Sequence, residues 1–421
     1  MRAKRSNPFP GKRRYAEPAI GRAFARRVPR MLRAGAVLNV MCVTSRIVGI
    51  PYSNAATLGP AAGRHCTRFR LTRAIAQTVG ILVMTPVLVT GGSGFIGQHL
   101  VSQLVARGRQ VRVLDVCAPA RALPAVEYIK GSVLDARVVD DAAAGVGEIY
   151  HLAGLPGMWK LDRTEFHDVN FIGTRNVLAA ARRHDVARLL HCSTESIFFN
   201  AARPASDEEA SLSADEMPGP YTRSKMLGDE LAMQAAASGM PVIIGCPTMP
   251  IGPSDRNVTP PTAMLQYFLG KSFFQPYLDF IVNMVDVRDA AAGLILAMEK
   301  GRIGHRYLLG GDSLSLGKIL TLMASISGRG KFLVPLPGIV AELAAFFIEL
   351  KADYITGREP SATVEGVRIA RRATALSIEK ARRELGYVAR PVEPMLREII
   401  ANMVGAPAAH GSEARLAVSA N

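Results

Sequence analysis

One glycine-rich segment constrains the fold of this chain more than any other feature, and it reads Val87-Leu88-Val89-Thr90-Gly91-Gly92-Ser93-Gly94-Phe95-Ile96-Gly97. Its first four residues predict a buried strand, and Gly97–Arg107 predicts a helix. Glycines between a strand and a helix permit a tight turn, let the backbone approach a phosphate, and allow the helix to pack on the strand. The helix start adds free N–H groups and the positive end of the helix dipole. The segment therefore predicts a dinucleotide-binding turn at Gly91, Gly94, Phe95, Ile96 and Gly97.

Strand-like and helical segments alternate after this turn. The expected strands are Val111–Val116, Val126–Ile129, Glu148–Ala153 and Val186–Ser193, and the expected helices are Ala136–Ala144 and Asp168–His184. Strands that are separated by helices form a parallel sheet with right-handed crossovers and helices on both faces. Residues 85–245 are therefore predicted to form an α/β doubly wound (Rossmann) domain.

The composition of the sequence changes after about residue 245. Five prolines crowd into a short segment, namely Pro247, Pro250, Pro253, Pro260 and Pro261. Proline removes a backbone donor, so such a segment is unsuited to a regular element. Residues 246–405 are predicted to form mainly a smaller mixed α/β substrate-binding lobe, and the Ala- and Ser-rich residues 406–421 a disordered tail.

The most apolar stretch of the second lobe is Leu336–Leu350, which contains Pro337, Glu342 and Glu349. It is too short and too often interrupted for a membrane-spanning helix. A packed helix of the lobe is the favoured interpretation, and a wall of the substrate pocket or a membrane-surface helix are the alternatives.

The charge of the chain is concentrated at its N-terminus. Of the formal net charge of +16, residues 1–84 carry +15, from 16 Lys and Arg against the single acid Glu17, which leaves +1 for the rest. A near-neutral body argues against nucleic-acid binding. The basic leader has three interpretations: a targeting segment, a disordered arm for anionic surfaces, or upstream residues translated from an early start codon, with Met84 as the true start.

The five cysteines show neither paired spacing nor a Cys-x-x-Cys motif. This pattern favours no disulfide framework and no metal site, and a reducing compartment, the cytoplasm, is expected.

Asp115 closes the second predicted strand, 18 residues after Gly97. A carboxylate there accepts hydrogen bonds from the ribose hydroxyls of NAD and repels the additional phosphate of NADP. No arginine follows to accommodate that phosphate, since the next residues are Val116 and Cys117. The predicted cofactor is NAD rather than NADP.

Tyr221 and Lys225 are four residues apart, which places their side chains on one face of a helix. A lysine ammonium beside a phenol lowers the phenol pKa, so that Tyr221 can act as an acid or base near neutral pH. The pair follows a strand that ends in Ser193-Thr194, where a hydroxyl can hold a substrate oxygen. The predicted catalytic set is Tyr221, Lys225 and Thr194.

With these segments the chain resembles an extended short-chain dehydrogenase/reductase of the NAD-dependent epimerase/dehydratase family over roughly residues 85–400. Within it, the chain is most similar to hopanoid-associated epimerases and dihydroflavonol-reductase-like proteins. The resemblance is carried by the glycine turn, His151-Leu152-Ala153-Gly154, Val169–Asn176, Tyr221-x-x-x-Lys225, Val285–Ala290 and Lys380–Tyr387.

The resemblance implies a role for each matching residue. Tyr221 is the general acid/base, Lys225 binds the nicotinamide ribose, and Thr194 orients the reacting oxygen, with Ser193 in that role if the register differs by one. Ala153 and Gly154 line the adenosine and pyrophosphate channel. The chain departs from the family at Ser132, where an aspartate usually meets adenine, and at Glu195, where a small or apolar residue is common.

The substrate is less constrained than the cofactor. The diphosphate-binding arginines of nucleotide-sugar members are missing from the expected positions, and Arg256 is more simply a solvated surface residue. A carbinol or ketone substrate without a nucleotide, isoprenoid-, flavonol- or sugar-like, is therefore favoured. A nucleotide-sugar epimerase/dehydratase and a non-catalytic NAD-sensing regulator are the alternatives, and epimerisation and reduction both remain open. A small-molecule substrate and no nucleic acid are expected, while peripheral membrane contact and homodimer formation are left open.

Three further residues have structural interpretations. His151 is expected to be packed rather than catalytic, and Cys192 to be a small buried apolar residue. Trp159, in the loop after the fourth strand, either covers the substrate site or fills space.

Overall fold

The computed structural model describes residues 85–200, 205–210 and 212–405. Along the chain the α-helices and strands are β1 (Val87–Thr90), α3 (Phe95–Ala106), β2 (Val111–Asp115), β3 (Val126–Lys130), α4 (Ala136–Ala143), β4 (Glu148–His151), α5 (Thr164–His167), α6 (Gly173–Arg183), β5 (Arg188–Cys192), β6 (Ala205–Ser206), α7 (Pro220–Ala237), β7 (Val242–Pro247), β8 (Met249–Ile251), α8 (Pro260–Leu269), β9 (Phe274–Tyr277), β10 (Ile281–Asp286), α9 (Val287–Lys300), β11 (Arg306–Leu309), β12 (Ser313–Ser315), α10 (Leu316–Ser327), β13 (Phe332–Pro335), α11 (Gly338–Lys351), α12 (Val364–Arg372), β14 (Ala375–Leu376), α13 (Glu379–Leu385) and α14 (Val392–Gly405).

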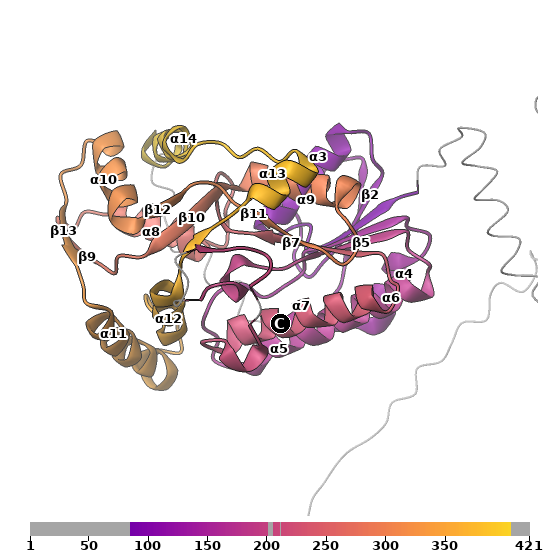
Figure 1. Ribbon diagram of the computed structural model, residues 1–421, viewed down its shortest axis with the longest axis horizontal. Helices are drawn as coiled ribbons and strands as arrows, with labels where there is room; N and C mark the ends of the chain where they lie inside the picture. Colours follow the sequence, from indigo (N-terminus) through magenta and orange to yellow (C-terminus); the bar gives the residue numbers. More distant parts are fainter. Residues whose placement is uncertain (1–84, 201–204, 211, 406–421) are drawn as a thin grey trace, which may run out of the picture. The chain divides into compact units, whose positions relative to one another are not determined.

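A seven-stranded parallel sheet with the order β11-β7-β5-β4-β1-β2-β3 forms the centre of the fold. Its inner strands are continuous apolar runs, as strands with both faces covered require, and all of β1 is buried. Helices α3 and α9 pack together on one face, and α4, α6 and α7 on the other (Figure 1). The prediction of a doubly wound Rossmann sheet is confirmed.

The sheet also recruits residues from beyond position 245. After the proline-rich segment, β10, α9 and β11 repeat the strand–helix–strand pattern, and β11 pairs with β7 at the edge of the main sheet. Helix α9 contributes Leu294 and Ile295 to the core beneath the sheet. The expectation that the proline-rich segment is unsuited to a regular element was wrong, because Pro247 ends β7, Pro250 lies in β8, and Pro260 and Pro261 begin α8. Part of residues 246–405 therefore continues the alternating pattern of the main sheet.

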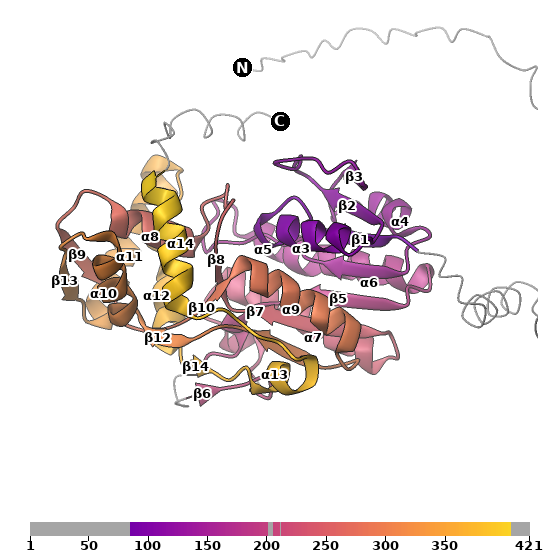
Figure 2. The same cartoon turned by 90° about the horizontal axis from the view of Figure 1, so that it is seen from above.

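Most of the remaining elements form the smaller mixed α/β lobe, while α13 packs on α9 and β11 and β14 pairs with β6. The lobe contains the three-stranded sheet β12-β10-β8 and the two-stranded pair β13-β9. Its own apolar core joins α8, α10 and α14, through residues such as Phe268, Ile319 and Leu396. Figure 2 shows α8, α10, α11, α12 and α14 gathered together, apart from α3, α4 and α6.

The packing of helix α11 differs from the expected packing. Helix α11 belongs to the lobe, as predicted, but it packs on α12 through the small residues Ala341 and Ala345. Its large apolar side chains are exposed, and Ile339 and Phe347 are 68% and 64% accessible. Because small residues let two helices approach closely, the larger residues are left on the outer surface.

Among the described residues, no helix has the length and apolarity needed to cross a membrane. The predictions of a basic leader over residues 1–84 and of a disordered tail over residues 406–421 lie outside the described residues.

Candidate active site

The glycine turn between β1 and α3 forms a cradle of backbone atoms. Gly91 adopts a positive φ of 72°, and a Cβ atom there would lie 2.6 Å from the Ala153 nitrogen. A Cβ at Gly97 would overlap the carbonyl oxygen of Gly91. No side chain caps α3, so the N–H groups of its first turn are open to a ligand, and the buried Ser93 hydroxyl has no partner among the described residues. These features fit a pyrophosphate at the helix N-terminus.

Asp115 lies at the end of β2 beside this cradle. Its carboxylate accepts hydrogen bonds from the Ser93 and Cys117 backbone nitrogens, each at 2.9 Å. These bonds hold the carboxylate at the cavity wall, where ribose hydroxyls can reach it. Ser132 lines the same region, and its hydroxyl accepts a hydrogen bond from the Leu134 nitrogen.

A single cavity of about 610 Å³ brings together all of the predicted site residues. The residues that line it include Gly91, Gly94, Phe95, Ile96, Gly97, Asp115, Ala153, Gly154, Thr194, Tyr221 and Lys225. The carboxyl ends of parallel strands meet at one edge of such a sheet, which explains why segments far apart in sequence meet there.

Tyr221 and Lys225 lie on the first turns of α7, as the spacing predicts. The Lys225 ammonium donates a hydrogen bond to the Cys192 carbonyl oxygen at 2.9 Å, and burial lowers the pKa of Lys225. Burial raises the pKa of Tyr221, the Glu195 carboxylate raises it further, and a hydrogen bond with Thr194 opposes them. The pKa of Tyr221 is therefore raised, chiefly by burial, where the Tyr221/Lys225 spacing predicted that it would be lowered. The Lys225 ammonium donates instead to the Cys192 carbonyl oxygen at the end of β5.

Thr194 and Glu195 form a second polar pair at the site. The Thr194 hydroxyl donates to the Glu195 carboxylate at 3.0 Å. Burial raises the pKa of Glu195 to about 7, so this carboxyl titrates near neutrality. The neighbouring Ser193 hydroxyl is buried and has no hydrogen-bond partner among the described residues. Both predicted candidates for orienting the reacting oxygen thus line the cavity.

Glu365, on α12, is a residue that the sequence did not single out. Its buried carboxylate accepts hydrogen bonds from the backbone nitrogens of Tyr221 and Thr222, at 3.1 and 2.7 Å, and from the Thr222 hydroxyl at 2.7 Å. It satisfies the free N–H groups at the start of α7 from the other lobe. The contact spans 144 residues, so no local sequence signal announces it.

Asn170 is a second such residue. It lies in a matching segment of the family, but no role was predicted for it. Its side chain accepts from the Leu155 nitrogen at 2.8 Å and donates to the Ser224 hydroxyl at 2.9 Å. It fixes the loop after β4 against α7, the helix that carries Tyr221 and Lys225.

The packed interpretation of His151 is confirmed: it is buried between the Thr90 and Thr174 hydroxyls, and burial lowers its pKa to about 3. Trp159 fills space and donates to Asp353 at 2.7 Å, while its neighbour Met158 lines the cavity. Cys192 is only half-buried and lines the cavity, which differs from its expected burial, and its environment raises its pKa to about 11.

The part of the cavity formed by the second lobe is mainly apolar. Its walls include Phe280, Val282 and Ile369, together with Met158 and Phe199 from the first domain. Arg256 is the one arginine among the described lining residues, and it is exposed. The cavity therefore has no cluster of cations for a substrate diphosphate.

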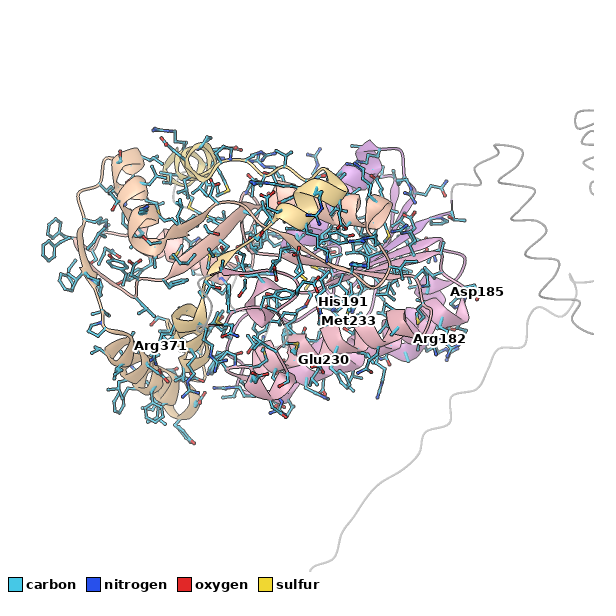
Figure 3. All side chains as sticks on the ribbon, in the orientation of Figure 1. Arg182, Asp185, His191, Glu230, Met233 and Arg371 are labelled. Atoms are coloured by element: carbon cyan, nitrogen blue, oxygen red, sulfur yellow. The ribbon has the colours of Figure 1, made fainter. Side chains whose placement is uncertain are left out.

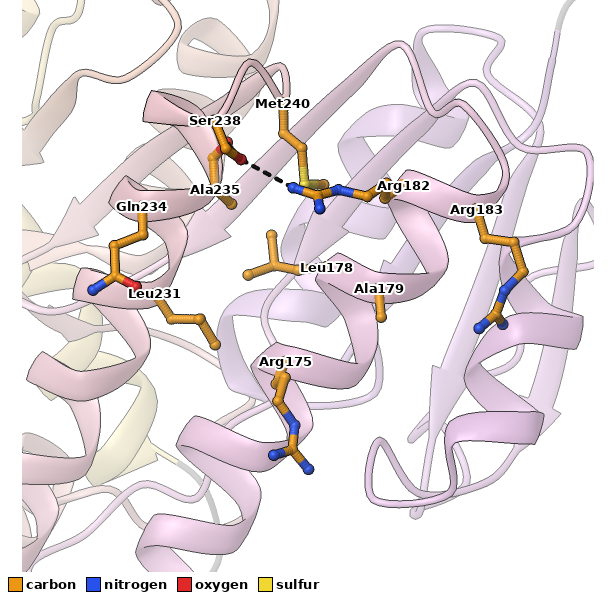
Figure 4. A pocket seen from close by; sticks show the side chains of 10 residues that line it. All are labelled: Arg175, Leu178, Ala179, Arg182, Arg183, Leu231, Gln234, Ala235, Ser238 and Met240. Carbon is orange, nitrogen blue, oxygen red and sulfur yellow. Dashed lines mark hydrogen bonds between the residues drawn. The ribbon is translucent and has the colours of Figure 1, made fainter.

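A second, shallower pocket of about 520 Å³ lies between α6 and α7 (Figure 4). It is lined by Leu178, Leu231 and Met240 and by three arginines, of which Arg182 donates to the Ser238 hydroxyl. It has no acid or nucleophile among its lining residues that suits catalysis.

The doubly wound sheet, its glycine cradle and the Asp115 carboxylate define a dinucleotide-binding enzyme fold. The model of the NAD dependent epimerase/dehydratase family matches residues 87–310. The chain belongs to this family, and it is an NAD-dependent enzyme of the short-chain dehydrogenase/reductase type.

Individual relatives extend over most of the described chain. It is 32% identical to the Synechocystis protein named "Putative dihydroflavonol 4-reductase" over 74% of this chain and 92% of the relative. It is 31% identical to Sterol demethylase protein B of Methylococcus capsulatus over 72% and 93%. The crystal structure of gox2253, 29% identical, covers 76% of this chain and 98% of its own with a TM-score of 0.65.

Proposed function

We propose that the protein oxidises or reduces a carbinol or ketone carbon of an apolar, nucleotide-free substrate, with Tyr221, Lys225 and Thr194 as the acid/base site. The observation that carries the proposal is the single cavity, in which this set faces the glycine cradle on one side and apolar walls on the other. In this proposal, residues 85–245 mainly bind the cofactor and residues 246–405 mainly select the substrate.

The residues of the cradle fit the dinucleotide: Gly91, Gly94 and Gly97 take the pyrophosphate and Asp115 the adenosine ribose. NAD, when bound, supplies hydride exchange with the substrate carbon. Thr194 holds the substrate oxygen by a hydrogen bond. The Tyr221 hydroxyl gives a proton to that oxygen in reduction and takes it back in oxidation. The Lys225 ammonium holds the ribose side of the site and stabilises negative charge on Tyr221 when that charge forms.

The chemistry of the walls supports an apolar substrate. A nucleotide-sugar substrate carries a diphosphate, and the exposed Arg256 alone is a poor match for it. Flavonol and sterol appear in the names of the relatives. We therefore place isoprenoid, sterol and flavonol alcohols or ketones first and sugar-like substrates after them.

Turnover with a panel of such compounds tests this proposal. Replacing Tyr221 with Phe removes the proton donor and is expected to lower kcat about 100- to 10,000-fold. The affinity for NAD, measured by calorimetry, should change little. Tyr267→Phe, at an exposed tyrosine outside the cavity, is the matched control. Full turnover by Tyr221→Phe on the best substrate would exclude this mechanism.

Two alternatives are separated when nucleotide sugars are added to the panel. A nucleotide-sugar epimerase/dehydratase would turn over only nucleotide sugars, and a non-catalytic NAD-sensing regulator would bind NAD and turn over nothing. The amount of NADH consumed per product formed distinguishes reduction from epimerisation. Reduction consumes one NADH for each product, whereas epimerisation leaves the amounts of NAD and NADH unchanged.

We also infer a cytoplasmic homodimer. Cys117, Cys192 and Cys246 are free thiols, which suits a reducing compartment. The apolar pocket between α6 and α7 is the face we assign to the dimer (Figure 4). Sedimentation equilibrium of the parent and of Leu231→Glu tests it, since a buried charge on this face should release monomers.

A further inference from the structure

Helix α11 and the turn after it carry the largest run of exposed apolar side chains in the described part of the chain. Phe347 is 64% accessible, Tyr354 81% and Ile355 77%. We call this surface the α11 face, and it consists of Ile339, Val340, Leu343, Phe346, Phe347, Leu350, Tyr354 and Ile355. Exposed apolar side chains that stand singly are ordinary, but a contiguous run on one helix marks an interaction site.

The acids of this segment are turned away from the α11 face. Glu342 forms ion pairs with Arg368 and Arg371 on α12, and Figure 3 shows Arg371 reaching α11. Glu349 and Asp353 both pair with Arg163 in the loop after β4. Each negative charge is thus neutralised on the inner side.

The cations of the segment are not neutralised. Lys351 and Arg358 are exposed, and neither forms an ion pair within the described residues. The same lobe exposes a second aromatic cluster, in which Phe273 and Phe274 stack on Phe332 with ring centroids 6.4 and 6.1 Å apart. Lys331 lies beside it and donates to the backbone carbonyl oxygens of Gly270 and Ser272, and it too forms no ion pair in the part of the chain that the structure describes.

We propose that the α11 face docks on an anionic membrane surface, with its apolar side chains among the acyl chains and Lys351 and Arg358 at the headgroups. The α11 face is bordered by the two unpaired cations Lys351 and Arg358 and, beyond Arg358, by the exposed acid Glu359. Cations are thus in excess beside the apolar side chains, which is the pattern of an interfacial helix. A bilayer with anionic lipids attracts the unpaired cations and accepts the apolar side chains without requiring a shaped partner.

The inner side of α11 connects this surface to the cavity. Arg163, which binds Glu349 and Asp353, belongs to the same loop as Met158, and Met158 lines the cavity. Helix α12, on which α11 packs, adds Ile369 to the cavity wall. A membrane-bound α11 therefore places a lipid reservoir next to the elements that form the apolar part of the site. The docking surface goes beyond the proposed reaction and does not depend on it.

Vesicle flotation of the full chain tests the apolar part of the contact. The vesicles contain phosphatidylcholine with phosphatidylglycerol, and about 0.5 M salt screens the basic residues 1–84, which all variants share. The double variant Leu343→Gln/Phe347→Gln is expected to bind about tenfold or more weakly than the parent. The control Ile303→Gln/Val388→Gln, at exposed apolar residues outside the face, should bind like the parent.

Two further measurements locate the contact. Vesicles should slow amide hydrogen exchange across residues 338–356 in the parent. At low salt, Lys351→Glu/Arg358→Glu should weaken binding to anionic vesicles about fivefold for each cation.

Equal flotation of the parent and the α11-face variant, with unchanged exchange over residues 338–356, would overturn the proposal. A parent dimer that Leu343→Gln/Phe347→Gln dissociates in the absence of lipid would overturn it as well, since the face would then join two copies of the chain.

Discussion

At the scale of single residues, Glu195 is the group whose ionisation most affects the site. Its pKa is raised from 4.5 to about 7 by burial, and its negative charge raises the pKa of Tyr221. When Glu195 ionises, Tyr221 holds its proton more firmly and becomes a weaker proton donor. The carboxyl thus links the proposed acid/base group Tyr221 to pH in the neutral range.

Glu195→Gln tests this link through stability and rate. The folded state binds the Glu195 proton more tightly than the unfolded state, so the parent loses stability as the pH rises from about 4.5 through about 7. The variant has no such loss, and its Tm should exceed that of the parent at pH 8 by more than at pH 5. The pH profile of kcat/KM should lose its transition near pH 7. Parallel Tm curves for the two proteins across this range would contradict the prediction.

Individual site residues were predictable where a local pattern carries the chemistry. The glycine turn and Asp115 follow from the strand–turn–helix context, and Tyr221 and Lys225 share a helix face at their spacing. The raised pKa of Tyr221 was not predictable, because it depends on burial and on a Glu195 charge that only the folded cavity places beside it.

At the scale of elements, α12 holds the start of α7, the helix that carries Tyr221 and Lys225. Glu365 accepts the N–H groups of Tyr221 and Thr222, in the way that an N-cap residue does from within a helix. Gly219 leaves the room for it, since a Cβ there would lie 2.6 Å from Glu365 Cγ. The orientation of Tyr221 therefore depends on a residue of the second lobe.

Glu365→Ala is expected to lower kcat and to destabilise the fold by about 1–3 kcal/mol, because buried N–H groups lose their acceptor. Glu365→Gln keeps one acceptor oxygen and should recover part of the lost kcat. Glu359→Ala, at an exposed acid of the same lobe, is the control. Thermal unfolding and steady-state kinetics measure both effects, and a residue that serves stability alone would leave kcat unchanged in the folded fraction.

The sequence of α11 does not by itself specify which side of the helix packs against the rest of the protein. Apolar residues surround most of this helix, so periodicity does not show which side packs. The packing is chosen by Ala341 and Ala345, whose small side chains admit α12, and by the arginines that meet Glu342 and Glu349. These partners come from elsewhere in the chain, and the expectation of a conventionally packed helix missed them.

At the scale of the whole molecule, the two parts of the chain are interwoven. The chain leaves the main sheet after β7, enters the lobe, and returns through α9 and β11 before it enters the lobe again. The alternating pattern predicted the first five strands of the sheet. The return of β11 was not predictable in this way, because its pairing with β7 is decided by tertiary packing and not by its own four residues.

A chain that ends at Pro247, the last residue of β7, should consequently be insoluble or only partly folded. It lacks α9, and the apolar edge of β7 loses its neighbour β11 and becomes open to pairing with other chains. A chain that ends at residue 405 keeps both and should unfold cooperatively. Soluble yield and the circular dichroism melt compare the two, and a cooperative melt of the shorter piece would show that the sheet is complete without β11.

The same return to the sheet governs how this enzyme can be recombined with its relatives. The second lobe is not one exchangeable cassette, because its elements come from between β7 and α9, from between β11 and α13, and from α14, each separated by segments that belong to the main sheet and its helices. Grafting this lobe onto a relative therefore requires all three segments to be transplanted together, along with the Glu365 carboxylate that the recipient's α7 needs.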